Sequence, residues 1–146
     1  MIDSLKQLFA KNLDMLTKEI SAYSDEEKLW VKEGEVNNST GTLCLHLCGN
    51  LQHFIGGVLG NSGYVRDRQG EFSKTLSRTE LLAEIEQAKS SVEQALTKIA
   101  QEQLKENYPI EVFGHPMTVE YFLIHLQGHL NYHLGQISYH RRLLDR

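Results

Sequence analysis

The chain has 146 residues and only two prolines, a length and composition typical of one globular domain, and we expect residues 1–146 to form a single domain. Its formal net charge is −4, with no basic stripe, which argues against nucleic acid as a partner. The first residues alternate charged with apolar side chains and fit neither a signal peptide nor a membrane span. We therefore expect a cytoplasmic protein that does not enter the membrane.

Four long segments repeat apolar residues at steps of three and four, the spacing of a helix with one buried face. They cover residues 2–22, residues 39–60, residues 78 to about 104, and residues 118 almost to the carboxyl end. Almost no segment has the pattern of a strand. The sequence thus predicts an all-α protein, a four-helix bundle in which each helix buries its apolar stripe.

Short sequence signals mark where these helices begin and where they are separated. Ser24 and Ser77 each start a Ser-x-x-Glu sequence, which predicts a helical turn after Ser24 and the third long helix after Ser77. Residues 61–73 mix turn formers with charged side chains and have no sustained period. We expect them to form a long loop between helices two and three, of the kind that often carries function.

The two cysteines, Cys44 and Cys48, lie one helical turn apart on the second helix. A regular helix arranges such side chains poorly for a disulfide, and free cysteine is among the most often buried residues. We expect two buried free thiols.

Seven histidines occur in the chain, and four of them lie within the last 22 residues. His129 and His133 lie in the apolar stripe of the fourth helix, one turn apart, so both imidazoles can reach one cation without bending the backbone. The alternative is that each is an interior histidine bonded to a carbonyl. A shared cation would satisfy two adjacent ring acceptors at once, and His125 and Gln136 are candidate neighbours of such a site.

A third ligand should come from a facing helix, and His46 on helix two is the best candidate because it lies at the edge of that helix's apolar stripe. His53 is the alternative ligand. Asn50 and His53 follow on the same side of the helix and are candidates for a hydrogen bond to a ligand or for substrate contacts. The other histidines are expected outside the metal site: His115, His125 and His140.

Three neutral nitrogen ligands with open positions suit Zn²⁺, Ni²⁺ or Fe²⁺, and they leave room for water or a substrate thiolate. The predicted site, made of His46, His129 and His133, is thus of the catalytic type.

Two segments carry a resemblance to a known family. NSTGTLCLHLCGNLQHFIGG, which contains His46, and GHLNYHLGQISYHRRLL, which contains His129 and His133, resemble the DinB/YfiT-like superfamily of metal-binding four-helix bundles. The order of elements agrees over essentially the whole chain, and the loop YVRDRQGEF resembles a branch of uncharacterised bacterial members. In that superfamily one histidine from helix two and a His-x-x-x-His on helix four hold the metal.

The resemblance implies a function as well as a fold. Characterised members include transferases and an isomerase that use low-molecular-weight thiols such as bacillithiol or mycothiol, and homodimers and a role in stress response are common. By resemblance we expect a metal-dependent thiol S-transferase that acts on electrophilic small molecules. Arg66 and Arg68 are then candidates to bind a carboxylate of the thiol or substrate, and a solvated loop is the alternative for both.

Two other functions compete with thiol transfer. One is metal-assisted hydrolysis, in which a carboxylate such as Glu71 or Glu120 acts as the base, although no carboxylate lies at a diagnostic spacing from the histidines. The other is a non-catalytic bundle that serves as a stress-response binding module or a structural dimer. The sequence alone does not decide whether the protein is an enzyme.

Overall fold

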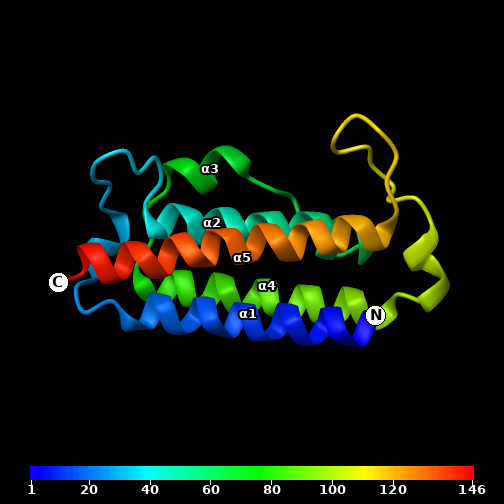
Figure 1. Ribbon diagram of the computed structural model, residues 1–146, viewed down its shortest axis with the longest axis horizontal. Coiled ribbons are helices and arrows are strands. Elements are labelled where there is room, and N and C mark those ends of the chain that lie inside the picture. The colour runs from blue at the N-terminus through cyan, green and yellow to red at the C-terminus, as the bar shows by residue number, and fades with distance from the viewer.

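The computed structural model describes residues 1–146 and confirms the four long helices (Figure 1). They are α1 (Ile2–Ala22), α2 (Thr40–Leu51), which continues as η2 (Gln52–Leu59), α4 (Arg78–Lys98) and α5 (Val119–Leu144). The chain contains no strand, only one isolated antiparallel bridge between Asn107 and Thr118. None of the helices is both long and apolar enough to cross a membrane.

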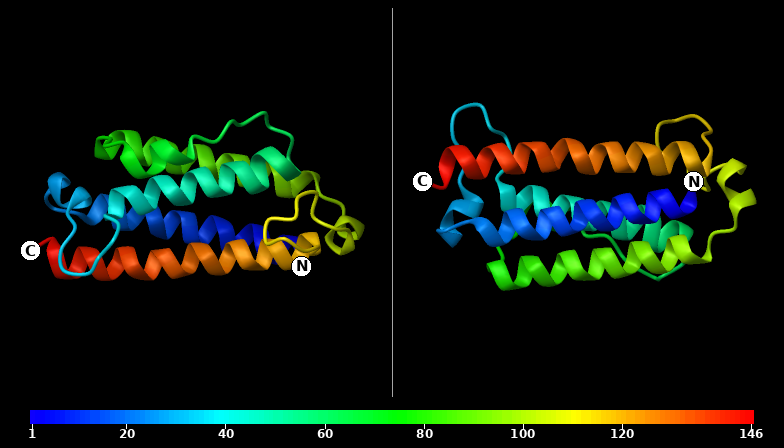
Figure 2. Two further views of the ribbon diagram at one scale, coloured as in Figure 1. Left: turned by 90° about the horizontal axis from the view of Figure 1, so that it is seen from above. Right: turned by 60° about the horizontal axis from the view of Figure 1, so that its bottom comes forward.

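The helices form a bundle in which α1 and α5 run in one direction while α2 and α4 run in the other (Figures 1 and 2). Helix α1 packs against α4 and α5, and α2 packs against the same two helices. Each helix therefore turns one apolar stripe to a common core, to which the fully buried Phe9, Leu47, Ile85 and Phe122 each contribute from a different helix.

The predicted starts of three helices are confirmed by their caps. The side chains of Ser39, Ser77 and Thr118 accept hydrogen bonds from the backbone N–H groups of Thr42, Glu80 and Tyr121. Ser77 and Glu80 complete the predicted capping box. Such caps satisfy amides that have no partner inside the helix and stabilise each helix by about 1 kcal/mol.

The predicted helical turn after Ser24 is confirmed as the short helix η1 (Glu26–Trp30), but the predicted cap and one helix end are wrong. Asp25 caps η1, whereas Ser24 instead donates to the carboxylate of Asp145. The third long helix ends at Lys98 and not near residue 104, because the backbone of Ile99 is extended, with ψ 125°. The chain then forms a separate short helix, η3 (Gln101–Lys105), which still buries Leu104 in the core.

The segment between η2 and α4 is long, as predicted, but it contains one short helix. This is α3 (Arg68–Ser73), whose first turn is capped by the carboxylate of Asp67 accepting from the N–H of Gly70. It lies against α2 on the outside of the bundle (Figure 1). This segment shows no apolar period because six residues are too few to show one.

Helix two changes its hydrogen-bond pattern at Gln52. Residues 52–59 form a π-helix, which ends where the N–H of Gly60 donates to the carbonyl of Ile55. Segments of π-helix are rare and are frequent at functional sites. This one begins directly after the part of α2 that faces α5.

Candidate metal centre

The structure brings together the three histidines that the sequence singled out. One ring nitrogen from each of His46, His129 and His133 lies within 4.8 Å of the other two. The Nε2 atoms of His46 and His129 are 3.3 Å apart, and the ring of His46 meets that of His133 edge to face. All three rings are largely but not fully buried.

The cluster follows from the helix geometry. Residues four apart on one helix face lie one above the other, so α5 presents His129 and His133 as neighbouring rings. Helix α2 packs beside α5 in the opposite direction and places His46 against this pair. No loop is needed to assemble the three rings, which gives the site a rigid frame.

A carboxylate from the interhelical segment holds the ring of His46. The Nδ1 of His46 lies 3.2 Å from Oε1 of Glu71, which belongs to α3. Arg66 in turn donates two hydrogen bonds to Glu71, Nε to Oε2 at 2.8 Å and Nη2 to Oε1 at 3.0 Å. Because Glu71 accepts from Nδ1–H, the lone pair of His46 is on Nε2, which faces the other two rings.

Gly49 allows Glu71 to come this close. A Cβ atom at residue 49 would lie 2.0 Å from Oε2 of Glu71, far inside a normal contact. Only the bare backbone of glycine leaves room for the carboxylate between α3 and α2. Glu71 is 6% exposed and Arg66 9% exposed, so this ion pair is shielded from water.

The other two rings differ in their partners. Nδ1 of His133 lies 2.7 Å from Oε1 of Gln136, so a proton on Nδ1 leaves the Nε2 lone pair free. Nδ1 of His129 is buried and has no hydrogen-bond partner. His129 can satisfy the lone pair of His46 only with a proton on Nε2, and then its own Nδ1 lone pair is buried without a donor.

The surroundings keep the two rings of α5 neutral. Burial, with the neighbouring His133 and His46 adding to it, lowers the pKa of His129 to about 4. Burial also lowers the pKa of His133, although its bond to Gln136 acts in the opposite direction. For Glu71, burial alone would raise the pKa, but the bonds from His46 and Arg66 outweigh it and lower the pKa. At pH 7 the site thus combines neutral His129 and His133 with an ionised carboxylate.

These residues fit a divalent cation. Two nitrogens bound to one tetrahedral Zn²⁺ at about 2.0–2.1 Å lie about 3.3–3.4 Å apart, and the Nε2 atoms of His46 and His129 already have this separation. A cation would also take the lone pairs that the imidazoles cannot all satisfy among themselves. The hydrogen bond of His46 to Glu71 is of the kind that fixes a metal-binding histidine.

The remaining predicted site residues lie around the cluster. Asn50 is buried one turn after His46, and its Oδ1 has no partner. His53 is half-buried against Phe54 and is not one of the three clustered histidines. Burial and the charge of Arg66 lower its pKa.

Arg66 and Arg68 differ sharply in their surroundings. Arg66 is occupied by Glu71, as described above, and its guanidinium also lies 5.7 Å from the centre of the Phe54 ring. Arg68 is exposed at the first residue of α3. A role for either arginine in binding a substrate carboxylate stays a prediction.

The three other histidines lie outside the cluster. His115 contacts its own loop and His125 stacks on Phe122. His140 is buried two turns beyond His133, where Nδ1 lies 2.6 Å from the hydroxyl of Tyr23 and Nε2 lies 2.8 Å from the carbonyl of Val31.

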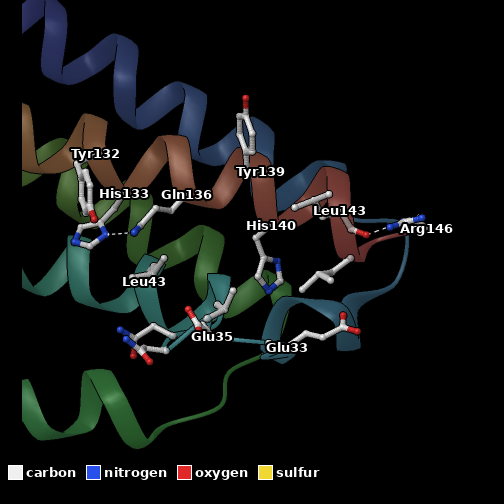
Figure 3. Close-up of a pocket in the computed structure, with 15 residues that line it drawn as sticks. Glu33, Glu35, Leu43, Tyr132, His133, Gln136, Tyr139, His140, Leu143 and Arg146 are labelled. Carbon is white, nitrogen blue, oxygen red and sulfur yellow. Dashed lines mark hydrogen bonds between the residues drawn. The ribbon is translucent and has the colours of Figure 1, made fainter.

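A pocket of about 750 Å³ opens beside His133. It follows α5 toward the carboxyl end and is closed on the other side by the loop of residues 33–38 (Figure 3). Polar, apolar and aromatic side chains share its lining. A small molecule in this pocket would have direct access to one ring of the cluster.

The sequence identified the three rings but not what holds them. From the sequence, Glu71 is a candidate base, and Arg66 is a candidate substrate contact or a solvated loop residue. Their link to His46 spans 25 residues of sequence and depends on where α3 lies. Gly49 was a weak signal for it, because a glycine inside a helix often marks a close approach of another group.

The comparisons with known proteins agree with the geometry. The crystal structure of a DinB-like protein from Bacillus cereus ATCC 10987 superposes with a TM-score of 0.78 over 97% of this chain and 91% of that chain, at 17% sequence identity. This likeness shows that the fold is the DinB-like helical bundle expected from the sequence. No curated protein matches the chain. The model of the family described as "Protein of unknown function (DUF1572)" matches residues 1–146, and the chain therefore belongs to this DUF1572 family.

Proposed function

We propose that the protein binds one divalent cation, Zn²⁺, Ni²⁺ or Fe²⁺, through His46, His129 and His133 and acts as a metal-dependent thiol S-transferase on electrophilic small molecules. The observation that carries the proposal is the convergence of three imidazoles, two of them with Nε2 atoms 3.3 Å apart, beside an open pocket. When bound, such a cation supplies a Lewis acid that lowers the pKa of a thiol ligand.

The chain's own residues have three tasks in this reaction. Glu71 and Gln136 fix the rings of His46 and His133, and the pocket beside His133 holds the organic part of a reactant. The thiol releases its proton to solvent, its sulfur forms a bond to the electrophilic carbon, and the leaving group departs with the electron pair of the broken bond. No redox partner is required.

Hydrolysis is the less favoured candidate because neither proposed base is free. Both oxygens of Glu71 accept hydrogen bonds from Arg66, and one also contacts His46. Glu120 is paired with Lys105 and precedes His129 by nine residues, about 13 Å along the helix. A carboxylate held in this way can orient a ring but is poorly placed to take a proton from water.

The first test is metal content. Protein purified without an affinity tag should contain close to one equivalent of a divalent metal by elemental analysis, and the His46→Ala and His129→Ala variants should lose it. Retention of a full equivalent by both variants would place the metal elsewhere.

The second test is activity. Metal-loaded protein is incubated with low-molecular-weight thiols and a panel of electrophiles, and the conjugates are measured by mass spectrometry with and without a chelator. We expect chelator-sensitive conjugation with at least one thiol. Absence of conjugation across the panel, together with chelator-sensitive ester or amide cleavage, would favour hydrolysis, whereas neither activity would favour a non-catalytic bundle.

A further inference from the structure

The pocket beside His133 has two walls of different chemistry. One wall is the face of α5 that carries Tyr132, Tyr139 and Leu143, large side chains that are each more than half exposed. The other wall is the loop of residues 33–38, which follows η1 and contributes Glu33 and Glu35. In Figure 3 these carboxylates lie across the pocket from His140, whereas the ring of Tyr139 projects from α5 away from the loop.

The two carboxylates have no partner. Neither Glu33 nor Glu35 forms an ion pair or a side-chain hydrogen bond, although five ion pairs between Lys or Arg and a carboxylate exist in the chain. The one cationic side chain in the lining, Arg146, lies at the end far from His133 and donates through Nε to the carbonyl of Leu143. The α5 side of the pocket is thus largely aromatic and aliphatic, and the loop side is anionic, with Glu35 nearer His133 and Glu33 nearer Arg146.

The pocket is also long. Its lining follows α5 from His133 to Leu144, which is about 16 Å at the helical rise per residue. A ligand that fills it would be an extended molecule and not a single ion. Its aromatic or aliphatic body would lie on the tyrosine wall, and a positive group would find Glu33 and Glu35.

We infer that this pocket binds the electrophilic reactant of the proposed transfer and selects amphipathic molecules that carry an amine or another cationic group. The role of the ligand as a reactant rests on the proposed function, whereas its binding in the pocket does not. A low-molecular-weight thiol that carries free carboxylates would be repelled by Glu33 and Glu35, so such a thiol is the less suitable occupant. Its electrophilic partner therefore takes the pocket and ends at His133.

Three probes with one indole body test the charge preference: tryptamine, tryptophol and indoleacetate. Binding to metal-free full-length protein is measured by calorimetry, and the site is mapped by amide chemical shifts. We expect tryptamine to bind about 10-fold more tightly than tryptophol, the effect of one favourable charge contact of roughly 1.4 kcal/mol, and indoleacetate to bind most weakly. Equal affinities, a preference for indoleacetate, or no binding of any probe would overturn the inference.

Variants locate the effect. The double variant Glu33→Gln/Glu35→Gln should bind tryptamine no better than tryptophol, while Glu102→Gln/Glu106→Gln, which removes the same charge near η3 at the other end of the bundle, should leave the preference intact. Leu143→Trp should fill the pocket and weaken all three probes. Shifts confined to amides outside the pocket would also overturn the inference.

The outcome is separable from that of the proposed function, because no turnover and no metal is involved. Tryptamine binding in a protein that never conjugates a thiol would refute the transferase alone. Thiol conjugation by a protein whose pocket shows no charge preference would refute the inference about the pocket alone.

Discussion

Helix α5 contributes to two side-chain clusters about two turns apart, one around His129 and His133 and one around the single histidine His140, and they differ in what the ring nitrogens contact. At His140 both nitrogens have partners, the hydroxyl of Tyr23 and the carbonyl of Val31. The hydroxyl of Tyr23 also contacts Thr40, 2.7 Å away, and burial raises the pKa of Tyr23 to about 12. This cluster is closed, and it ties α5 to α1 and α2.

At the other cluster the nitrogens face one another. His129 has one nitrogen without a partner and the other directed at His46, and the space beside His133 is open. Both clusters are built from the same residue type on the same helix. The comparison teaches that a buried histidine with both nitrogens bonded to protein supports the fold, whereas rings whose free lone pairs converge are prepared for a ligand.

The largest expected effect is a loss of metal affinity when a residue of the three-histidine cluster is replaced. His129→Ala removes one of three ligands and should weaken the binding of Zn²⁺ by more than 100-fold, beyond the 10- to 100-fold typical of losing an outer partner. Competition with a chromophoric chelator measures it. His125→Ala, on the exposed side of the same helix, should retain the parent affinity, and equal affinities in both variants would contradict the assignment.

A smaller effect is expected at the partner of His46. Glu71→Gln should weaken metal binding by about 10- to 100-fold, because the ring loses its charged acceptor. It also leaves the shielded charge of Arg66 unpaired, and the variant should lose roughly 3–5 kcal/mol of unfolding free energy. The matched control is Glu86→Gln, an exposed site on α4, which should change neither. Unchanged metal affinity in folded Glu71→Gln would show that the hydrogen bond does not support the site.

At the cluster around His140 we expect a substitution to lower stability and to leave metal affinity unchanged. Tyr23→Phe leaves Nδ1 of His140 without its donor and should lower the free energy of unfolding by about 1–3 kcal/mol, measured by urea denaturation. Metal affinity should stay the same. A loss of metal in this variant would mean that the two clusters are coupled along α5.

The metal-free protein should lose stability in acid through the open cluster. The unfolded chain binds a proton at residue 129 near pH 6.5, but the folded chain does so only near the lowered pKa of about 4. Between these values the unfolded state binds more protons, so stability is full above pH 6.5, falls as the pH drops toward 4, and levels off below. Allowing for partial exposure of the ring, the loss is on the order of 1–2 kcal/mol. In His129→Ala the free energy of unfolding should change less with pH over this window. An unchanged pH dependence would show that other groups cause it.

The smallest effect compares two glycines inside helices. Nothing lies within 4 Å of a Cβ built on Gly128 of α5, so Gly128→Ala should stabilise the protein by up to about 1 kcal/mol through helix propensity, with no change in metal affinity. Gly49→Ala should instead destabilise the protein and weaken metal binding, because the new methyl group would displace Glu71. Thermal denaturation with and without Zn²⁺ distinguishes the two. A stabilising Gly49→Ala would show that α3 can shift without consequence.

Local signals were enough to predict the long helices and the three histidines. Apolar periodicity defined the helices, and the Ser77 capping box placed the start of one of them. His129 and His133 lie four residues apart, which places both rings on one face of a helix. His46 was found by its position on a facing stripe, and the buried free thiols of Cys44 and Cys48 were also predicted correctly.

Features that depend on tertiary packing could not be predicted in this way. The role of Glu71 requires knowing that α3 folds back on α2, and α3 itself is too short for periodicity to reveal. The π-helical end of the second helix has the same composition as an ordinary apolar helix. The pocket, in turn, combines a loop near residue 35 with the last helix, two segments about 100 residues apart in sequence.

Helix α3 is too short to persist in water by itself, since isolated helices need about 12–15 residues to be even marginally stable. Its anchors include Glu71 and the ring of Phe72, which packs against His46 with ring centres 5.3 Å apart. The amide protons of residues 68–73 should therefore exchange with deuterated solvent at a rate that reports how firmly His46 is held. A six-residue helix thus provides a spectroscopic view of the metal centre that requires neither a substrate nor a coloured ion.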